Sequence, residues 1–482
     1  MRALRVFASE LGLHHVRDSH APRDIILICL SRFTRLLGFG AVAPVLLIFL
    51  RAIDIPERAV GFFLTATLLG DVVLSLFVTQ TADLLGRRRM LALGSALMCA
   101  SGVAFYLSHS FVVLLVAAIV GIISPTGNET GPFAALEQAM LSQLTEQDGR
   151  VSLLMWYQVI GYAGMGTGSV LTSIMVSSLN RAGKPPLVAY KAIFLLYAVA
   201  AAVKIVLSLA LSAHSELDHP PVPPKTTSTA STASAEGDGE RQPLLQHQTA
   251  SSTASAVLDP PQELPPTPTP LPIARLVVLC AIFSLDAFAS SLGPGSFIAY
   301  FLRETFSAPV ALIASIFSVA SVTTCVSQLA AGSISKRLGV VKTMVATHIP
   351  AQLFTIALGL APTLPLALTF LLARACIASM DASVRGAFLS AVVPRSSRTK
   401  FLGIVDVCKT LASTPGPTLS LGLASMGHIR IAFVLMGSIK IICESAWIGR
   451  CLASHASSSR ARLRLCATPS SHARHRASAT PR

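Results

Sequence analysis

Several ionisable side chains lie inside long apolar runs of this sequence, where they could bind a ligand, carry a proton or hold helices together. They are Arg35, Asp71, Asp286, Arg374 and Asp381. An ionisable group in hydrocarbon costs about 2.5–3.5 kcal/mol on insertion scales, so each needs a partner or a polar cavity. We expect Arg35 and Asp71 to lie near the middle of a membrane, where an ion pair between them is possible. With Asp286 and Arg374 they would line or bound a central cavity; the alternative is that charge pairs only lock helices together.

The elements that must position these charges are apolar helices. Of the 482 residues, 52% are apolar and 13% are charged, whereas an ordinary soluble protein carries about 25% charged residues. A spanning helix needs about 20 mainly apolar residues, because its backbone must satisfy its own hydrogen bonds in lipid. Such runs occur near 24–50, 59–81, 90–108, 111–136, 151–177, 188–212, 273–301, 309–333, 341–361, 364–392, 401–425 and 429–449. The sequence therefore predicts an all-α membrane protein with twelve transmembrane helices in two pseudo-symmetric six-helix bundles, and it excludes a soluble enzyme.

Composition divides the chain into five segments. The N-terminus, residues 1–23, lacks the apolar core of a signal peptide. The two bundles are expected at 24–212 and 273–450. Between them, residues 213–272 are rich in Pro, Ser, Thr and Ala, which is typical of a disordered linker. The tail, 451–482, is basic and rich in Ser and Ala, and we expect it to be disordered as well.

The net charge of +15 carries topological information. With the N-terminus in the cytosol, 24 of the 38 Lys and Arg residues fall on cytosolic segments and 7 on the opposite side. Cytosolic loops of membrane proteins carry such an excess of basic residues. Both termini are therefore predicted to be cytosolic, and the basic surplus does not indicate a nucleic-acid partner.

The two halves of the sequence resemble one another in order and spacing. Leu47–Arg51 corresponds to Ala299–Arg303, and Leu85-Gly86 corresponds to Leu338-Gly339. At nearly the same spacing, Glu129 corresponds to Asp381. A duplicated six-helix unit predicts a binding site near the membrane midplane, between two halves that rock against each other.

The loop after the second apolar run carries a further motif, Asp83-Leu84-Leu85-Gly86-Arg87-Arg88-Arg89. It resembles the signature of the major facilitator superfamily, with Leu84 in place of the usual basic residue and Thr79 in place of the usual Gly. Similarity to a poorly characterised fungal branch of that family extends over both bundles. It is carried by Leu69–Leu76, Ser124–Glu129, Ser379–Asp381, Lys336–Met344 and Gly403–Leu411.

The resemblance implies a gating role for Asp83, Gly86, Arg87, Arg88 and Glu129. In that family the loop's carboxylate meets the N-terminus of helix 11, where the helix dipole favours negative charge. Arg87 would then pair with Glu129 at the cytosolic end of helix 4. The alternative is that the loop is a plain basic anchor that stays in the cytosol.

Four glycines mark the fifth apolar run, Gly161, Gly164, Gly166 and Gly168, and Pro415-Gly416-Pro417 interrupts the eleventh. Close helix packing or a bend is the expected role of these residues. Drug–proton antiporters of the resembled family carry a Gly-Pro motif in helix 5, and the absence of the proline here argues mildly against that class.

A short motif in the linker suggests a location. Glu240, Leu244 and Leu245 fit the acidic dileucine pattern that vesicle-coat adaptors read. We expect sorting to the vacuolar or endosomal membrane, with the plasma membrane as the alternative.

No catalytic, cofactor-binding or metal-ligating pattern is found in the sequence. The nine cysteines contain no CxxC pair, and neither a Walker loop nor a hydrolase motif is present. The sequence and the resemblance favour a monomeric secondary transporter in the lipid bilayer. It would move a small solute by alternating access, with proton coupling through Asp71, Asp286 or Asp381 as one option. A multidrug–proton exporter and a non-transporting nutrient sensor of the same fold are the alternatives.

Overall fold

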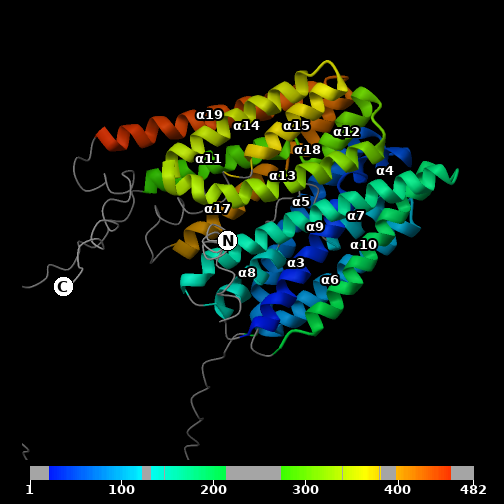
Figure 1. Cartoon of the computed structure of the whole chain (residues 1–482), viewed down its shortest axis with the longest axis horizontal. Coiled ribbons are helices and arrows are strands. Elements are labelled where there is room, and N and C mark those ends of the chain that lie inside the picture. The colour runs from blue at the N-terminus through cyan, green and yellow to red at the C-terminus, as the bar shows by residue number, and fades with distance from the viewer. Residues whose placement is uncertain are drawn as a thin grey trace, which may run out of the picture. The chain divides into compact units, whose positions relative to one another are not determined.

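The computed structural model describes residues 21–121, 132–145, 147–212, 216, 273–338, 340–378, 380 and 398–456, and every regular element among them is a helix. These helices belong to one unit, which comprises Met1–Leu217 and Leu271–Arg482 (Figure 1). Of the predicted linker only Glu216 is described, and the first six residues of the predicted disordered tail, 451–456, instead continue the last helix. The rest of both segments, with Glu129, Asp381 and the dileucine residues Glu240, Leu244 and Leu245, lies outside the described residues.

The helices fall into two sets that follow the predicted runs. The first set, here called the N-half, contains α3 (Pro22–Val42), α4 (Leu46–Ala52), α5 (Glu57–Leu85), α6 (Arg87–Leu107), α7 (Phe111–Val120), α8 (Pro132–Leu144), α9 (Gln147–Arg181) and α10 (Pro186–Leu209). The second set, the C-half, contains α11 (Ile273–Ser291), α12 (Gly295–Phe306), α13 (Val310–Leu338), α14 (Val340–Leu360), α15 (Leu364–Ala378), α17 (Arg398–Ser413), α18 (Gly416–Ser425) and α19 (Ile429–Ala456).

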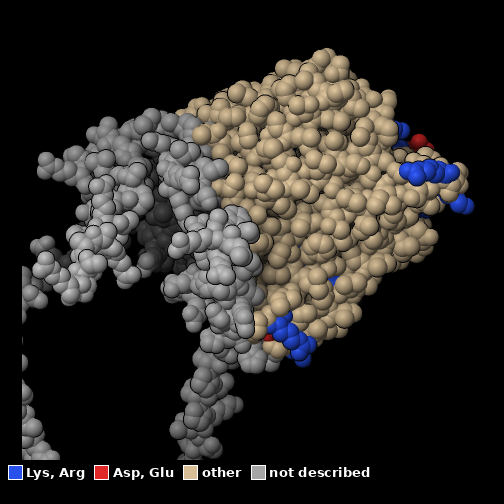
Figure 2. All heavy atoms as spheres, viewed as in Figure 1, with Lys and Arg blue, Asp and Glu red and all other residues tan. Residues whose placement is uncertain are grey.

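Helix length and hydropathy agree with a membrane location. Six helical stretches in the described residues are long and apolar enough to cross a membrane: Pro22–Val42, Glu57–Val78, Arg87–Leu107, Leu153–Arg181, Pro186–Leu209 and Val310–Ala330. Large apolar side chains such as Val73, Val112 and Val206 are more than half exposed. On the face in Figure 2, nearly all charged side chains gather near helix ends and leave a broad area almost uncharged. Such a surface suits lipid rather than water.

Prolines break the predicted runs at corresponding places in the two halves. Pro44 separates α3 from α4, and Pro294 separates α11 from α12. The predicted interruption of the eleventh run is confirmed, because α17 ends at Ser413 and α18 begins at Gly416. A proline lacks the backbone N–H that would continue the helical ladder.

Glycines allow α3 and α9 to approach very closely. A methyl group added at Gly164 or Gly168 would collide with the backbone carbonyl of Phe33 or Leu37, and one added at Gly40 would collide with the backbone of Met165. Glycine permits such backbone contact because it has no Cβ atom. The close packing predicted for the glycines of the fifth run is therefore confirmed for this pair.

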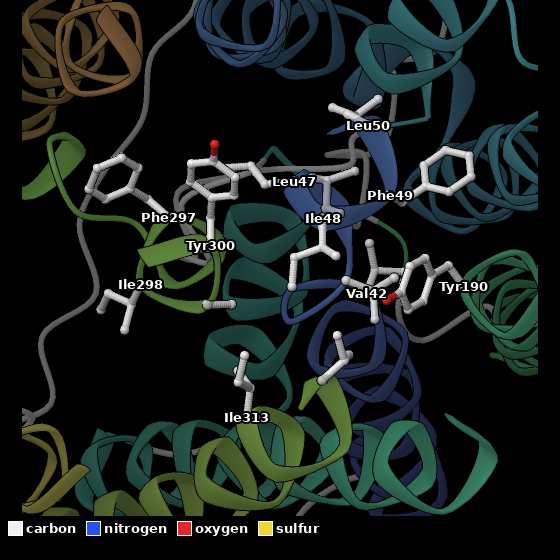
Figure 3. Packing of buried hydrophobic residues seen from close by; sticks show 14 of the residues in the cluster. Val42, Leu47, Ile48, Phe49, Leu50, Tyr190, Phe297, Ile298, Tyr300 and Ile313 are labelled. Atoms are coloured by element: carbon white, nitrogen blue, oxygen red, sulfur yellow. The ribbon is translucent and has the colours of Figure 1, made fainter. Parts of the chain in front are cut away.

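A shared apolar core joins the two halves at the end of the helices remote from Pro22 and Leu209. Residues of α4, including Phe49, pack with residues of α12, including Tyr300, and the two short helices lie side by side (Figures 1 and 3). Figure 3 also shows Tyr190 of α10 and Ile313 of α13 in this core. The two helix pairs α5–α18 and α9–α13 extend the contact between the halves.

The structure differs from the sequence prediction in the fourth helix. The run at 111–136 was expected to end where polar residues begin, whereas α8 continues to Leu144 and α9 starts at Gln147. The added turns carry Glu137, which is fully buried. A polar residue that faces the inside of a bundle does not end a helix, so hydropathy alone misplaced this boundary.

Candidate functional site

Glu137 of α8 is the centre of a buried polar cluster in the N-half. Its Oε2 accepts hydrogen bonds from Arg35 Nη2 at 2.8 Å and from the Tyr157 hydroxyl at 2.5 Å. Its Oε1 lies 3.5 Å from Lys204 Nζ and accepts a hydrogen bond from the Ser31 hydroxyl at 3.3 Å. We call Ser31, Arg35, Glu137, Tyr157 and Lys204 the Glu137 cluster. It joins α3, α8, α9 and α10, so four helices of the N-half meet at one carboxylate.

Arg32 extends this cluster along α3. Its guanidinium lies 4.4 Å from the centre of the Tyr157 ring and donates a hydrogen bond to Gln158 Oε1 at 2.9 Å. Gly161 provides the room, because a methyl group there would lie 2.8 Å from Arg32 Nε. The aromatic face and the amide oxygen both favour a cation at this position.

The pair of Arg35 and Asp71 that the sequence made possible is not found among the described residues. Arg35 pairs with Glu137, and no ion pair between Arg35 and Asp71 is found in the described part of the chain. Asp71 is 8% exposed, and its Oδ1 has no hydrogen-bond partner among the described residues. The sequence had not offered Glu137 as a partner of Arg35, because it placed Glu137 in a loop.

A second group of charges lies in the C-half. Lys440 Nζ of α19 is 3.6 Å from Asp286 Oδ1 of α11, and His348 Nε2 of α14 is 3.8 Å from the same oxygen. Asp286 was predicted as a site residue, whereas Lys440 and His348 were not. As in the N-half, these side chains connect the first helix of the half, α11, to the last, α19.

The loop between α5 and α6 has a partner that the sequence did not reveal. Gly86 adopts a φ of +90°, and the backbone N–H groups of Arg87 and Arg88 donate to the Glu216 carboxylate at 2.6 and 3.3 Å. The Arg87 side chain donates to Gln143 Oε1 of α8 at 2.6 Å. Asp83 lies in the last turn of α5, and its side chain is outside the described part. Arg87 thus contacts Gln143 near the end of α8, while its expected partner Glu129 lies outside the described residues.

Five charged or titratable residues of these sites were missed in the sequence: Glu137, Lys204, Glu216, His348 and Lys440. Glu137 stands just beyond the run at 111–136, while Lys204 and Lys440 are single charges within their apolar runs. The rule that flagged Asp71, a charge within an apolar run, applied equally to both lysines.

Two hydroxyl pairs connect the halves directly. Thr65 of α5 lies 2.7 Å from Thr418 of α18, and Ser173 of α9 lies 2.8 Å from Ser315 of α13, measured between hydroxyl oxygens. Tyr300 of α12 donates a hydrogen bond to Glu57 of α5. These contacts, with the shared apolar core, close the end of the bundle remote from Pro22.

A disulfide between positions 173 and 315 is the expected result of mild oxidation of the double variant Ser173→Cys/Ser315→Cys. The two hydroxyl oxygens are 2.8 Å apart, and a disulfide needs its sulfur atoms about 2.05 Å apart. Gel electrophoresis after cleavage at a protease site inserted in the linker would detect the cross-link. The single variants serve as controls for the native cysteines, and halves that separate fully after oxidation would contradict this contact.

Comparisons with known proteins agree with this architecture. The sequence pattern of the Major Facilitator Superfamily matches residues 28–293 and 277–460, so the two matches begin in α3 and α11. A yeast relative, uncharacterized membrane protein YJR124C of Saccharomyces cerevisiae, is 32% identical over 436 residues, 89% of this chain and 94% of that protein. The quinolone resistance protein NorA of Staphylococcus aureus is 28% identical over 99 residues, 20% of this chain and 26% of that protein. A solved structure of a variant of the nucleoside transporter NupG has a TM-score of 0.63 at 12% identity and covers 89% of this chain and 99% of that one.

The chain therefore belongs to the major facilitator superfamily, a family of membrane transporters. The predicted fold class, two six-helix halves in a multi-pass membrane protein, is confirmed.

Proposed function

We propose that this protein is a secondary transporter that moves a small solute across a membrane by alternating access. The observation that carries the proposal is the set of ionisable groups inside the apolar helices of both halves of a major facilitator fold. These groups are Arg35 and Asp71 in the N-half, and Asp286 and Arg374 in the C-half. Charges inside such helices mark substrate or proton pathways in membrane proteins. Asp71, Asp286 and Asp381 are the candidates for proton coupling.

The contacts between the halves support a rocking motion. Small residues line the helix pairs that join them, with Gly61 against Thr418 and Gly166 against Ser321. Small residues let helices meet closely and without large interlocking side chains. Within each half, the Glu137 cluster and the Asp286–Lys440 pair connect several helices, so each half would move as a rigid body.

We assign a gating role to the loop between α5 and α6. The family resemblance implies that Asp83, Gly86, Arg87, Arg88 and Glu129 act in this gate. The Glu216 carboxylate at the start of α6 supports it, because negative charge is favourable at a helix N-terminus. The excess of basic residues at this end supports a cytosolic position for both termini. The dileucine motif supports a vacuolar or endosomal membrane.

Uptake into proteoliposomes under an imposed pH gradient tests the proposal. We expect the wild-type protein to accumulate at least one solute from a broad set of labelled small solutes. In Asp71→Asn and Arg374→Ala variants, reconstituted at equal density, we expect the rate of this uptake to fall at least about tenfold. Full activity in both variants would contradict the assigned site, and binding without flux would indicate the sensor alternative.

A further inference from the structure

Arg374 differs from the other cations that lie deep in the helices. It stands ten residues after Leu364, where α15 begins, which is about 15 Å along the helix and near the membrane midplane. Within the described part of the chain, its guanidinium forms neither a hydrogen bond nor an ion pair, and its Nε atom is buried. By contrast, Arg35, Lys204 and Lys440 each lie within 4 Å of a carboxylate oxygen.

The surroundings of Arg374 connect it to the interface between the halves. The Ser327 hydroxyl of α13 donates to the Cys376 carbonyl at 2.5 Å, which fixes α15 against α13 next to Arg374. On its other side α13 packs against α9 of the N-half, where Gly166 approaches Ser321. Arg374 is therefore on a helix whose neighbour forms part of the contact that must rearrange during alternating access.

An arginine without a counter-charge at this depth is unfavourable unless something else compensates its charge. A guanidinium presents its N–H donors in a planar fork that matches two oxygens of a carboxylate or phosphate group. A bound anion would supply the missing charge and accept these hydrogen bonds. A neutral or cationic solute would leave the charge uncompensated.

We propose that the solute of this transporter is a small anion and that Arg374 binds its carboxylate or phosphate group. The inference rests on the proposed function, since it names the class of solute for the same site. In the N-half, Arg35 and Lys204 share the single carboxylate of Glu137, so this cluster keeps an excess of positive charge.

Ligand-induced thermal stabilisation of the purified full-length protein tests this proposal without requiring transport. The probes are matched compounds on one short aliphatic and one aromatic skeleton, each as carboxylate, phosphate ester, amide and amine, in neutral detergent with zwitterionic lipid. A separate sample receives anionic lipid. We expect the stabilising compounds to be anions, and their apparent affinity to fall by about tenfold or more in Arg374→Gln. Arg374→Lys should retain part of the affinity, and Arg181→Gln, at the exposed last residue of α9, should retain all of it.

Stabilisation by amides or amines, anion binding that survives Arg374→Gln, or stabilisation by anionic lipid alone would overturn the proposal. Binding of the anions without any flux would contradict the proposed transport function and leave this inference standing. Flux of neutral or cationic solutes alone would contradict this inference and leave the proposed transport function standing.

A second variant tests whether Arg374 has a structural partner in the ligand-free protein. Because Arg374 has no counter-charge among the described residues, Arg374→Leu is expected to raise the apparent Tm by about 3 °C. A fall in Tm comparable to that of Lys204→Met, which breaks an ion pair, would show that Arg374 is a structural partner and overturn the proposal.

Discussion

Glu137→Gln is expected to lower the free energy of unfolding by about 3–5 kcal/mol, the cost of breaking a buried ion pair from one side. The substitution removes the carboxylate that Arg35 and Lys204 share, so two buried cations lose their partner. It also weakens the hydrogen bonds from Tyr157 and Ser31. The expected readout is a large loss of folded protein after detergent extraction and a fall in apparent Tm.

Two variants provide the comparison for Glu137→Gln. Lys204→Met should lower the free energy of unfolding by less, because Glu137 keeps its closer partner Arg35 at 2.8 Å. Glu304→Gln changes the same residue type at an exposed position and should leave Tm unchanged. If Glu137→Gln were as stable as Glu304→Gln, the Glu137 cluster would not hold the four helices together.

Gly168→Val is expected to disrupt the packing of α3 on α9. A Cβ atom at this position would collide with the Leu37 carbonyl oxygen and would lie 2.8 Å from the backbone nitrogen of Ala41. Because both contacts are to backbone, no side-chain rearrangement can relieve them. We expect the free energy of unfolding to fall by about 3 kcal/mol or more. The readouts are the apparent Tm and the yield of monodisperse protein.

Gly422 provides a matched control in another helix. A Cβ atom there would meet nothing within 4 Å, and alanine has the higher helix propensity by about 1 kcal/mol. Gly422→Ala should therefore keep or slightly raise Tm. A Gly168→Val variant that behaves like Gly422→Ala would show that α3 and α9 are farther apart than in this structure.

The fold could be predicted from the sequence because lipid imposes strict rules on composition. Each spanning helix needs a long apolar run, and the runs, the repeated Leu47–Arg51 and Ala299–Arg303 segments and the prolines were all visible. Pro415, for example, ends a helix where expected, because a missing N–H acts locally.

The partners within the site could not be predicted in the same way. The choice of Glu137 rather than Asp71 as partner of Arg35 depends on how α8 packs against α3, which is a three-dimensional fact. Glu216 lies after the last run of the N-half, and no spacing rule connects it to Gly86. A single charge in an apolar run indicates that a polar partner is needed, while the identity of that partner has to come from the structure.

The most direct test of alternating access is solute flux through proteoliposomes that contain the Ser173→Cys/Ser315→Cys variant. We predict that oxidation, which would fix α9 to α13, stops the flux of the solute identified in the uptake assay. Reduction of the disulfide is then expected to restore it, with the single variants unaffected throughout. Undiminished flux through fully cross-linked protein would contradict a mechanism in which the two halves move against each other.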